Sequence, residues 1–295
     1  MTVGSTSRPI VTAAGFTRLV VAYDGLTTTS YALDLARGLV DRCGLPAEVV
    51  TVFSPGLSAG ATRTEIESID AVQRLGAAVV ALASNDVVAA ITAHVAAIAS
   101  DTEGSGRAGR PLLCLASHGR GRLTEMVMGS VSENLVRTLG RPILLAGPAA
   151  RIISTLSETL LVSIDGSEPS ALILGVAQDW VASFGGTVRL LYVKAPDDDA
   201  RDARRYLGKA RDWLAGHGVE AATEVGVARS PQAGILHAAR GFGVAAVAMT
   251  THGRGRIRRL ERGSIALDVV RAAVRPVLLL NPHAEPPVGC KENKT

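Results

Sequence analysis

Aromatic residues and cysteine are both scarce in this sequence. Phenylalanine, tyrosine and tryptophan make up 3% of its 295 residues, and the three cysteines, Cys43, Cys114 and Cys290, are far apart without a C-x-x-C spacing. Neither a zinc site nor a disulfide framework is therefore expected. No long basic run alternates with aromatic residues, which argues against nucleic-acid binding. The core must come from small aliphatic side chains, which suit helices packed on a sheet.

Long uninterrupted apolar runs are also missing. The most apolar zone, residues 77–99, is broken by Asn85 and Asp86, and neither remaining piece reaches the roughly 20 residues that a membrane helix needs. The N-terminus carries no apolar segment of the kind found in secretory signals. We therefore expect a cytoplasmic protein without a membrane partner, with loose tails at 1–15 and 282–295.

What the sequence does contain is an internal repeat. An apolar run at 19–23 ends in Asp24, a second run at 160–164 ends in Asp165, and glycine follows each aspartate. Continuous apolar runs of this length are typical of buried parallel strands. In 295 residues, 47% of them hydrophobic, two domains of ordinary size are expected.

Strands and helices alternate in both copies of the repeat. Further strands are predicted at 49–53, 77–82, 112–116 and 143–146 in the first copy, and at 188–193, 222–227, 245–249 and 277–280 in the second. This alternation indicates parallel sheets with right-handed crossovers. We predict two tandem three-layer α/β/α domains, each with a five-stranded parallel sheet of the Rossmann-like or flavodoxin-like class. The domains would span 17–147 and 158–281, with a linker at 147–157.

A glycine-punctuated basic loop follows the fourth predicted strand of each copy. Residues 118–130 read HGRGRLTEMVMGS and residues 252–264 read HGRGRIRRLERGS. In an open parallel sheet, ligands bind beyond the carboxyl ends of the strands, where the strand order reverses. The final Gly-Ser opens a helix whose free N–H groups and positive dipole end attract phosphate. The residues expected to hold phosphates are Gly119, Arg120, Gly129 and Ser130 in the first copy and Gly253, Arg254, Gly263 and Ser264 in the second.

A purely structural interpretation of the same loop is open. Gly-Ser before a helix can be a cap alone, and Ser130-x-x-Glu133 fits a capping box, whose carboxylate would disfavour a nearby anion. The aspartates can likewise be turn residues before glycine. The same spacing in two copies, each paired with an aspartate after the first strand, favours a nucleotide site. Neither a P-loop nor a G-x-G-x-x-G motif after the first strand is present, which excludes those phosphate-binding classes.

With these motifs the chain resembles the universal stress protein family in its tandem two-domain form, over about residues 17–281. ATP-binding members of that family carry G-x2-G-x9-G-[S/T] after the fourth strand, and Asp at the end of the first. Both copies keep the second and third glycines, but Ala116 and Thr250 replace the first. If that position required a glycine-only backbone angle, strain on the order of 1–3 kcal/mol would weaken binding. If the backbone at that position has the ordinary angles of a strand, no strain arises and binding is not weakened.

The resemblance implies ATP, alone or with Mg²⁺, as the ligand. The binding residues that it implies beyond the phosphate loop are Asp24 and Asp165 at the ribose or the metal, Gly25 and Gly166 beside them, Val52 and Val193 near the adenine, Ala116 and Thr250 at the ribose, and Val131 and Ile265 near the phosphates.

Three functions follow from these observations. The first is an ATP-binding stress or regulatory protein that hydrolyses ATP slowly at most, and so is not an efficient enzyme. The second is an interaction scaffold of the same fold without nucleotide binding, which the changes at Ala116 and Thr250 support. The third, an adenylating or pyrophosphatase enzyme, lacks its expected S-G-G-x-D-S and H-I-G-H motifs.

The fifth predicted strands need cover, because an exposed apolar sheet edge promotes aggregation. In family members these edges associate. We therefore expect 143–146 to lie near 277–280, which would make a pseudo-twofold dimer within one chain. Pairing of whole chains into a homodimer is a further expectation.

Overall fold

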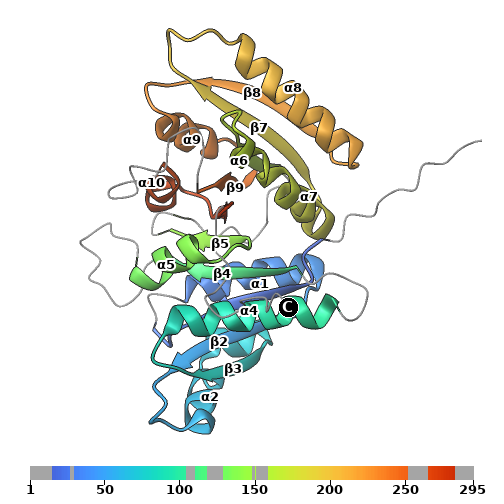
Figure 1. Ribbon diagram of the computed structural model, residues 1–295. Coiled ribbons are helices and arrows are strands. Elements are labelled where there is room, and N and C mark those ends of the chain that lie inside the picture. The colour runs from blue at the N-terminus through green and yellow to red at the C-terminus, as the bar shows by residue number, and fades with distance from the viewer. Residues whose placement is uncertain are drawn as a thin grey trace, which may run out of the picture.

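The computed structural model of the chain describes residues 15–26, 30–103, 110–117, 129–147, 150, 159–251 and 265–282. Strands and helices alternate through both halves (Figure 1). The first half contains β1 (Arg18–Ala22), α1 (Tyr31–Cys43), β2 (Ala47–Phe53), α2 (Ala59–Glu67), α3 (Asp70–Leu75), β3 (Ala78–Ala83), α4 (Val87–Glu103), β4 (Pro111–Ala116), α5 (Ser130–Thr138) and β5 (Ile143–Ala146). The second half contains β6 (Thr159–Ser163), α6 (Glu168–Ala171), α7 (Ile173–Phe184), β7 (Thr187–Lys194), α8 (Arg201–Gly216), β8 (Ala221–Val227), α9 (Pro231–Ala239), β9 (Val244–Thr250), α10 (Ile265–Ala272) and β10 (Val277–Leu280).

The strands form one sheet in the order β3-β2-β1-β4-β5-β10-β9-β6-β7-β8. Neighbouring strands within each half are parallel, as predicted. The strand order reverses beside the first strand of each half, because β1 lies between β2 and β4 and β6 lies between β7 and β9. The helices after the two flanking strands leave toward opposite faces at such a point, and a crevice opens at the carboxyl ends of the strands.

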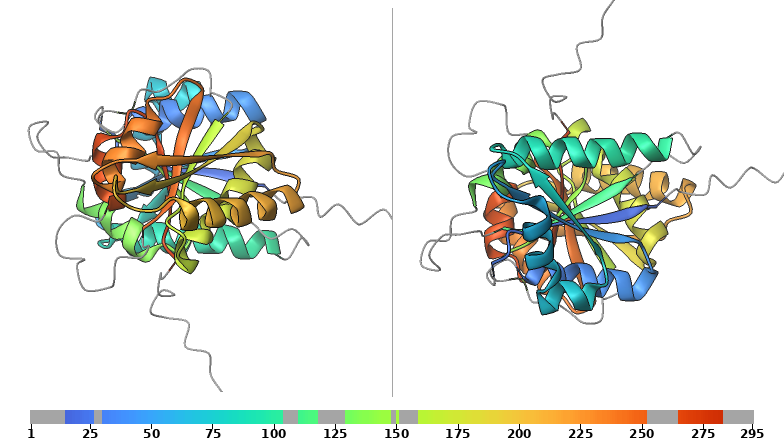
Figure 2. Two further views of the ribbon diagram at one scale, coloured as in Figure 1. Left: turned by 90° about the horizontal axis from the view of Figure 1, so that it is seen from above. Right: turned by 90° about the horizontal axis from the view of Figure 1, so that it is seen from below.

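Helices cover both faces of the sheet, so each half is a three-layer α/β/α unit. One core lies under α1, α2, α3, α7 and α8, and the other under α4, α5, α9 and α10. Leu19 and Val21 of β1 belong to the first core and Val20 to the second. Both faces are buried, which is why the strands read as continuous apolar runs. Figure 2 shows the twist of the sheet and the helices on its two sides.

The two halves meet through their fifth strands, as the sequence predicts. β5 and β10 pair antiparallel, with Leu144 opposite Leu278 and Ile143 opposite Leu279. All four side chains are at most 1% exposed. The first pair lies in one core and the second pair in the other, so both cores continue across the junction. The strand order outward from this junction is the same in both halves, so the antiparallel pairing relates them by a pseudo-twofold axis.

The segment between the second and third strands differs in the two halves. The second half has the single helix α8, with a buried stripe of Ala203, Leu207, Ala210 and Leu214. The first half has α2 and α3 instead, and no helix is predicted there from the sequence. Among the residues of α2 only Ile66 is buried, so no repeating apolar stripe marks that helix in the sequence.

The apolar zone at 77–99 folds as a strand followed by a helix, as predicted. β3 ends at Ala83, and α4 begins at Val87. Ile91 and Val95 of α4 are buried against the sheet. Within the described ranges, no helix combines the length and the hydrophobicity needed to cross a membrane.

Candidate nucleotide sites at the carboxyl ends of the strands

Each predicted aspartate follows the first strand of its half and precedes a glycine with a left-handed backbone. The φ angle is +82° at Gly25 and +79° at Gly166, a conformation that residues with a side chain rarely adopt. The N–H of Leu26 donates to Oδ1 of Asp24 at 3.1 Å. The Asp-Gly pair therefore turns the chain out of the sheet and keeps the aspartate at the carboxyl end of the strand.

The aspartate of the second half has more local support. Oδ1 of Asp165 accepts from the N–H of Ser167 at 3.0 Å and from its hydroxyl at 2.6 Å. Ser167 is also the N-cap of α6, where its hydroxyl accepts from the N–H of Ser170 at 3.3 Å. Leu26 occupies the position of Ser167 in the first half and has no hydroxyl. Asp24 is exposed, whereas Asp165 is half-buried.

The residues on either side of the predicted phosphate loop of the first half are hydrogen-bonded to each other. The N–H of Gly129 donates to the carbonyl oxygen of Ser117 at 2.8 Å. The buried hydroxyl of Ser132 donates to the carbonyl oxygen of Ala116 at 2.9 Å. These two hydrogen bonds fix the first turn of α5 beside the carboxyl end of β4, where the sequence predicts the phosphate site.

The first turn of α5 begins without a side-chain cap. Gly129 is its N-cap, with extended backbone at φ −60° and ψ 142°. Ser130 is therefore the first helical residue, and not the cap that a capping box with Glu133 requires. The carboxylate of Glu133 lies 3.8 Å from Arg137, one turn further along. The capping-box alternative does not describe this helix, and its first N–H groups have no acceptor within the helix.

Asp24, Val52 and α5 lie on the same side of the first half. Asp24 lies two residues beyond the end of β1. If the pairing of β1 with β2 and β4 is continued over those two residues, Asp24 lies opposite Val52 and Ser117. Val52 packs on the core under α4 and α5. Ala22, the last residue of β1, packs on the same core, and Asp24 follows it by two residues. The residues predicted for ribose, adenine and phosphate are therefore brought to one edge of the sheet.

The second half repeats this arrangement. If the pairing of β6 with β7 and β9 is continued for two residues beyond the end of β6, Asp165 lies opposite Val193 and Thr251. Val193 packs on the core under α9 and α10. The first residue of α10, Ile265, is 44% exposed, and its counterpart Val131 in α5 is 37% exposed. These two side chains are therefore exposed, whereas the residues after them, Ser132 and Ala266, are buried.

The two departures from the family motif cause no backbone strain. Ala116 ends β4 and Thr250 ends β9, and both are buried strand residues. No described residue other than glycine has a positive φ. The backbone at these two positions therefore has ordinary strand angles, and glycine is not required there in the protein itself.

Six residues of the predicted phosphate loops lie outside the described residues, and the structure does not place them. They are Gly119, Arg120, Gly253, Arg254, Gly263 and Ser264.

One carboxylate, that of Asp24 or Asp165, follows the first strand of each half. No group of three or more His, Cys, Asp or Glu side chains suited to a metal occurs in the described part of the chain. Mg²⁺ usually keeps several waters and binds through one or two carboxylates together with substrate phosphates. One aspartate per site fits that pattern. Burial raises the pKa of the neighbouring Tyr23, and the charge of Asp24 raises it further, so the phenol stays neutral beside the carboxylate.

Comparison with known proteins agrees with this architecture. A model of the universal stress protein family matches residues 15–146 and 157–281. A universal stress protein from Archaeoglobus fulgidus has a TM-score of 0.64 at 17% identity, covering 90% of this chain and 98% of its own. A putative universal stress protein from Pseudomonas aeruginosa gives 0.59 at 14% identity, covering 91% and 94%. A protein of unknown function from that organism gives 0.58 at 14%, covering 92% and 94%. No curated protein matches the chain.

At these identities the solved structures show a shared fold alone. The family match carries more weight, because it occurs twice and spans most of the chain. Each matched range contains the first strand with its aspartate and the turn from the fourth strand into the following helix. The chain therefore belongs to the universal stress protein family, with two copies of the family domain in tandem.

Proposed function

We propose that each half of this protein binds one ATP at the carboxyl edge of its sheet. ATP occupancy, with slow hydrolysis at most, would then regulate the protein as a stress or regulatory factor. The observation that carries the proposal is the 2.8 Å hydrogen bond from the Gly129 N–H to the Ser117 carbonyl oxygen. It holds the first turn of α5 where the strand order reverses, beside Asp24.

The first turn of α5 supplies the phosphate contacts in this proposal. The N–H groups of Ser130 and Val131 have no acceptor within the helix, and the helix dipole places about half a positive charge at this end. The exposed hydroxyl of Ser130 adds a further donor. Because Gly129 has no side chain, a phosphate can approach the backbone closely.

The sugar and base contact the neighbouring strands. Asp24 accepts hydrogen bonds from the ribose hydroxyls or, together with the phosphates, holds Mg²⁺, which would neutralise part of the phosphate charge when bound. Val52 offers apolar surface to the adenine. Asp165 and Val193 take the same roles in the second half. The support from Ser167 fixes the orientation of Asp165, so the two sites are expected to differ in affinity.

Equilibrium dialysis of the purified protein against ATP tests the proposal, with two equivalents bound per chain as the expected result. Gly129→Glu places a carboxylate at the mouth of α5, which repels phosphate, and should remove one equivalent. Gly208→Glu is the matched control. It introduces the same charge in the interior of α8, where an added Cβ meets nothing within 4 Å, and should leave two equivalents.

The outcomes separate the possible functions. No binding by the wild-type protein would overturn the proposal and favour the scaffold function. Binding that Gly129→Glu leaves unchanged would show that site one lies elsewhere. Steady-state phosphate release well above about 1 per second, the low end of ordinary enzyme rates, would favour an efficient enzyme instead.

A further inference from the structure

The second half contributes a buried side chain to the helix of the proposed ATP site in the first half, site one. Asn281 follows β10 and is 6% exposed. Its Nδ2 group donates a 2.5 Å hydrogen bond to the carbonyl oxygen of Arg137, in the last turn of α5. The last four carbonyl groups of a helix have no partner within the helix. Asn281 therefore caps the C-terminal end of α5 from the other half of the chain.

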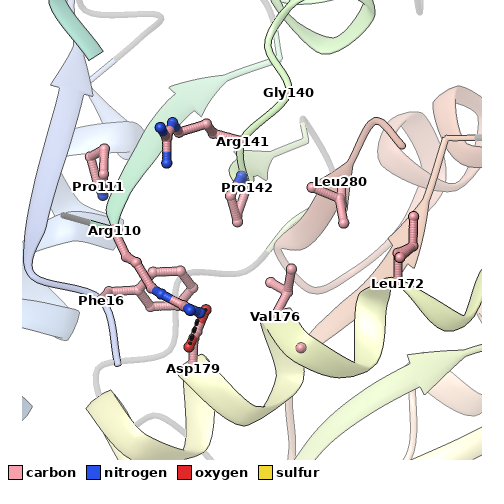
Figure 3. A pocket seen from close by; sticks show the side chains of 11 residues that line it. Phe16, Arg110, Pro111, Gly140, Arg141, Pro142, Leu172, Val176, Asp179 and Leu280 are labelled. Carbon is pink, nitrogen blue, oxygen red and sulfur yellow. Dashed lines mark hydrogen bonds and ion pairs between the residues drawn. The ribbon is translucent and has the colours of Figure 1, made fainter. Parts of the chain in front are cut away.

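The strands beside Asn281 hold its amide in place. The N–H of Thr251, which follows β9, donates to the carbonyl oxygen of Leu280 at 2.9 Å, so the end of β10 stays against β9. Leu280 lines a cavity of about 350 Å³ between the two halves, across from Pro142 of the first half (Figure 3). Leu280 packs on the core under α1 and α7, whereas Asn281 contacts α5 on the opposite face of the sheet.

The first turn of α5 is fixed by its own half. The N–H of Gly129 and the hydroxyl of Ser132 donate to the carbonyl oxygens of Ser117 and Ala116, at 2.8 and 2.9 Å. The helix has nine residues, which span roughly 14 Å. A helix this short moves as one body. A displacement of its last turn would therefore also displace the N–H groups of its first turn.

The corresponding helix of the second half is held differently. Gly147 stands 134 positions before Asn281 and follows β5. A Cβ at Gly147 would lie 2.1 Å from the carbonyl oxygen of Val270 in α10, so α10 packs directly on the backbone after β5. Glycine has no side chain to donate. The amide that reaches α5 therefore has no counterpart at Gly147, and the two proposed ATP sites are built unequally.

We propose that Asn281 is a positioning residue of site one, a role that rests on the proposed function, and that the second half thereby completes the ATP site of the first. Asn281 holds the last turn of α5, and α5 holds the N–H groups of Ser130 and Val131 toward the phosphates. A hydrogen bond weakens steeply when its donor turns away from the acceptor. The amide of Asn281 therefore contributes to ATP affinity without contacting ATP.

Asn281→Leu removes the amide donor at similar volume and should weaken ATP binding at site one about fivefold or more. Isothermal titration calorimetry on the full chain measures this loss, and site two should stay within about twofold of wild type. Asn281→Asp keeps the shape of the side chain, loses the donor when ionised and should weaken the same site. In a Gly129→Glu background, which lacks site one, Asn281→Leu should leave the remaining ATP affinity unchanged.

Arg110→Ala is the matched control. It also breaks a contact between the halves, but that contact involves α7 and not α5, so site one should stay within about twofold of wild type. Hydrogen exchange supplies a second readout, which needs no ATP. The amides of α5 should exchange faster in Asn281→Leu than in Arg110→Ala, because only the first variant releases the end of the helix.

The outcomes distinguish this role from the proposed function. Unchanged site-one affinity in Asn281→Leu, in a protein that binds two equivalents of ATP, would overturn the role of Asn281 and leave the proposed function intact. An equal loss of affinity in Arg110→Ala would do the same, because it would show a general loosening of the junction. Absence of ATP binding by the wild-type protein would overturn both. Unchanged exchange of α5 in Asn281→Leu would show that the amide does not hold the helix.

Discussion

The guanidinium of Arg110 donates a 2.6 Å hydrogen bond to the carboxylate of Asp179 across the boundary between the two halves. Arg110 precedes β4, and Asp179 lies in α7. The side chain of Asp179 is 8% exposed, whereas that of Arg110 is 45% exposed. The pair therefore consists of a buried acid and a half-exposed base, and removal of the base should be the more damaging change.

Arg110→Ala should lower the free energy of unfolding by about 2 kcal/mol at neutral pH. The substitution leaves the buried carboxylate of Asp179 without its counter-ion, which destabilises the folded state. The loss is smaller than for a fully buried pair because Arg110 is partly exposed. Urea unfolding of the two proteins measures the difference. In an Asp179→Asn background the same substitution should have a much smaller effect, because no buried charge remains. A loss of equal size in both backgrounds would contradict this account.

The cost of Arg110→Ala should also depend on pH. Burial raises the pKa of Asp179, and Arg110 opposes that rise, so removing the arginine raises the pKa further. The folded variant then binds the Asp179 proton more tightly than the unfolded chain does, and its stability falls as pH rises from about 4 through the folded pKa. Urea unfolding should show a smaller difference from wild type near pH 4 than near pH 7. A pH-independent difference would contradict this assignment.

The junction between β5 and β10 should be as sensitive as a protein core. Leu144→Ala removes a side chain that is fully buried opposite Leu278, and the cavity should cost about 2–5 kcal/mol. Chemical denaturation followed by circular dichroism measures this loss. Leu57→Ala is the control, since Leu57 is 63% exposed and its truncation should change stability by about 0.5 kcal/mol at most. Similar values for the two variants would show that the pairing contributes little.

The Asp-Gly turns should not tolerate a side chain. Gly166→Ala places a Cβ at a φ of +79° and should destabilise the protein by about 1–2 kcal/mol. Gly216→Ala is the opposite case, because an added Cβ there meets nothing within 4 Å and it ends the helix α8. That variant should be neutral or slightly stabilising. Thermal unfolding of both variants measures the contrast, and equal melting temperatures would count against it.

Within the proposed function, Asp24→Ala should weaken ATP binding at site one. Loss of a hydrogen bond to a charged group costs about 1.5–3 kcal/mol, roughly ten- to hundredfold in affinity. ATP titration should then show one weakened site and one unchanged site. Asp41→Ala, which removes an exposed carboxylate paired with Arg37, should leave both sites unchanged. Two unchanged sites in Asp24→Ala would exclude this role for Asp24.

Much of the fold could be predicted because its strands are buried on both faces. A run such as 112–116 can be identified as a strand from the sequence alone, because a strand that is covered by helices on both faces is apolar throughout. The helices α2 and α3 could not be predicted, because little of α2 is buried and its sequence has no apolar period. The identity of the helix cap at Gly129 was also ambiguous, because Ser130 and Glu133 have the spacing of a capping box. The hydrogen bond from Gly129 to Ser117 resolves that ambiguity.

The sequence by itself determined the repeat, the succession of strands and helices along each copy and the pairing of each aspartate with a late glycine-rich loop, because these depend on local patterns along the chain. Only the tertiary structure decided the relations between distant residues. The ion pair of Arg110 with Asp179 spans 69 positions, and the cavity beside it is bounded by both halves. Neither leaves a periodic signal in the sequence, because each depends on how the antiparallel junction of β5 and β10 brings the two halves together.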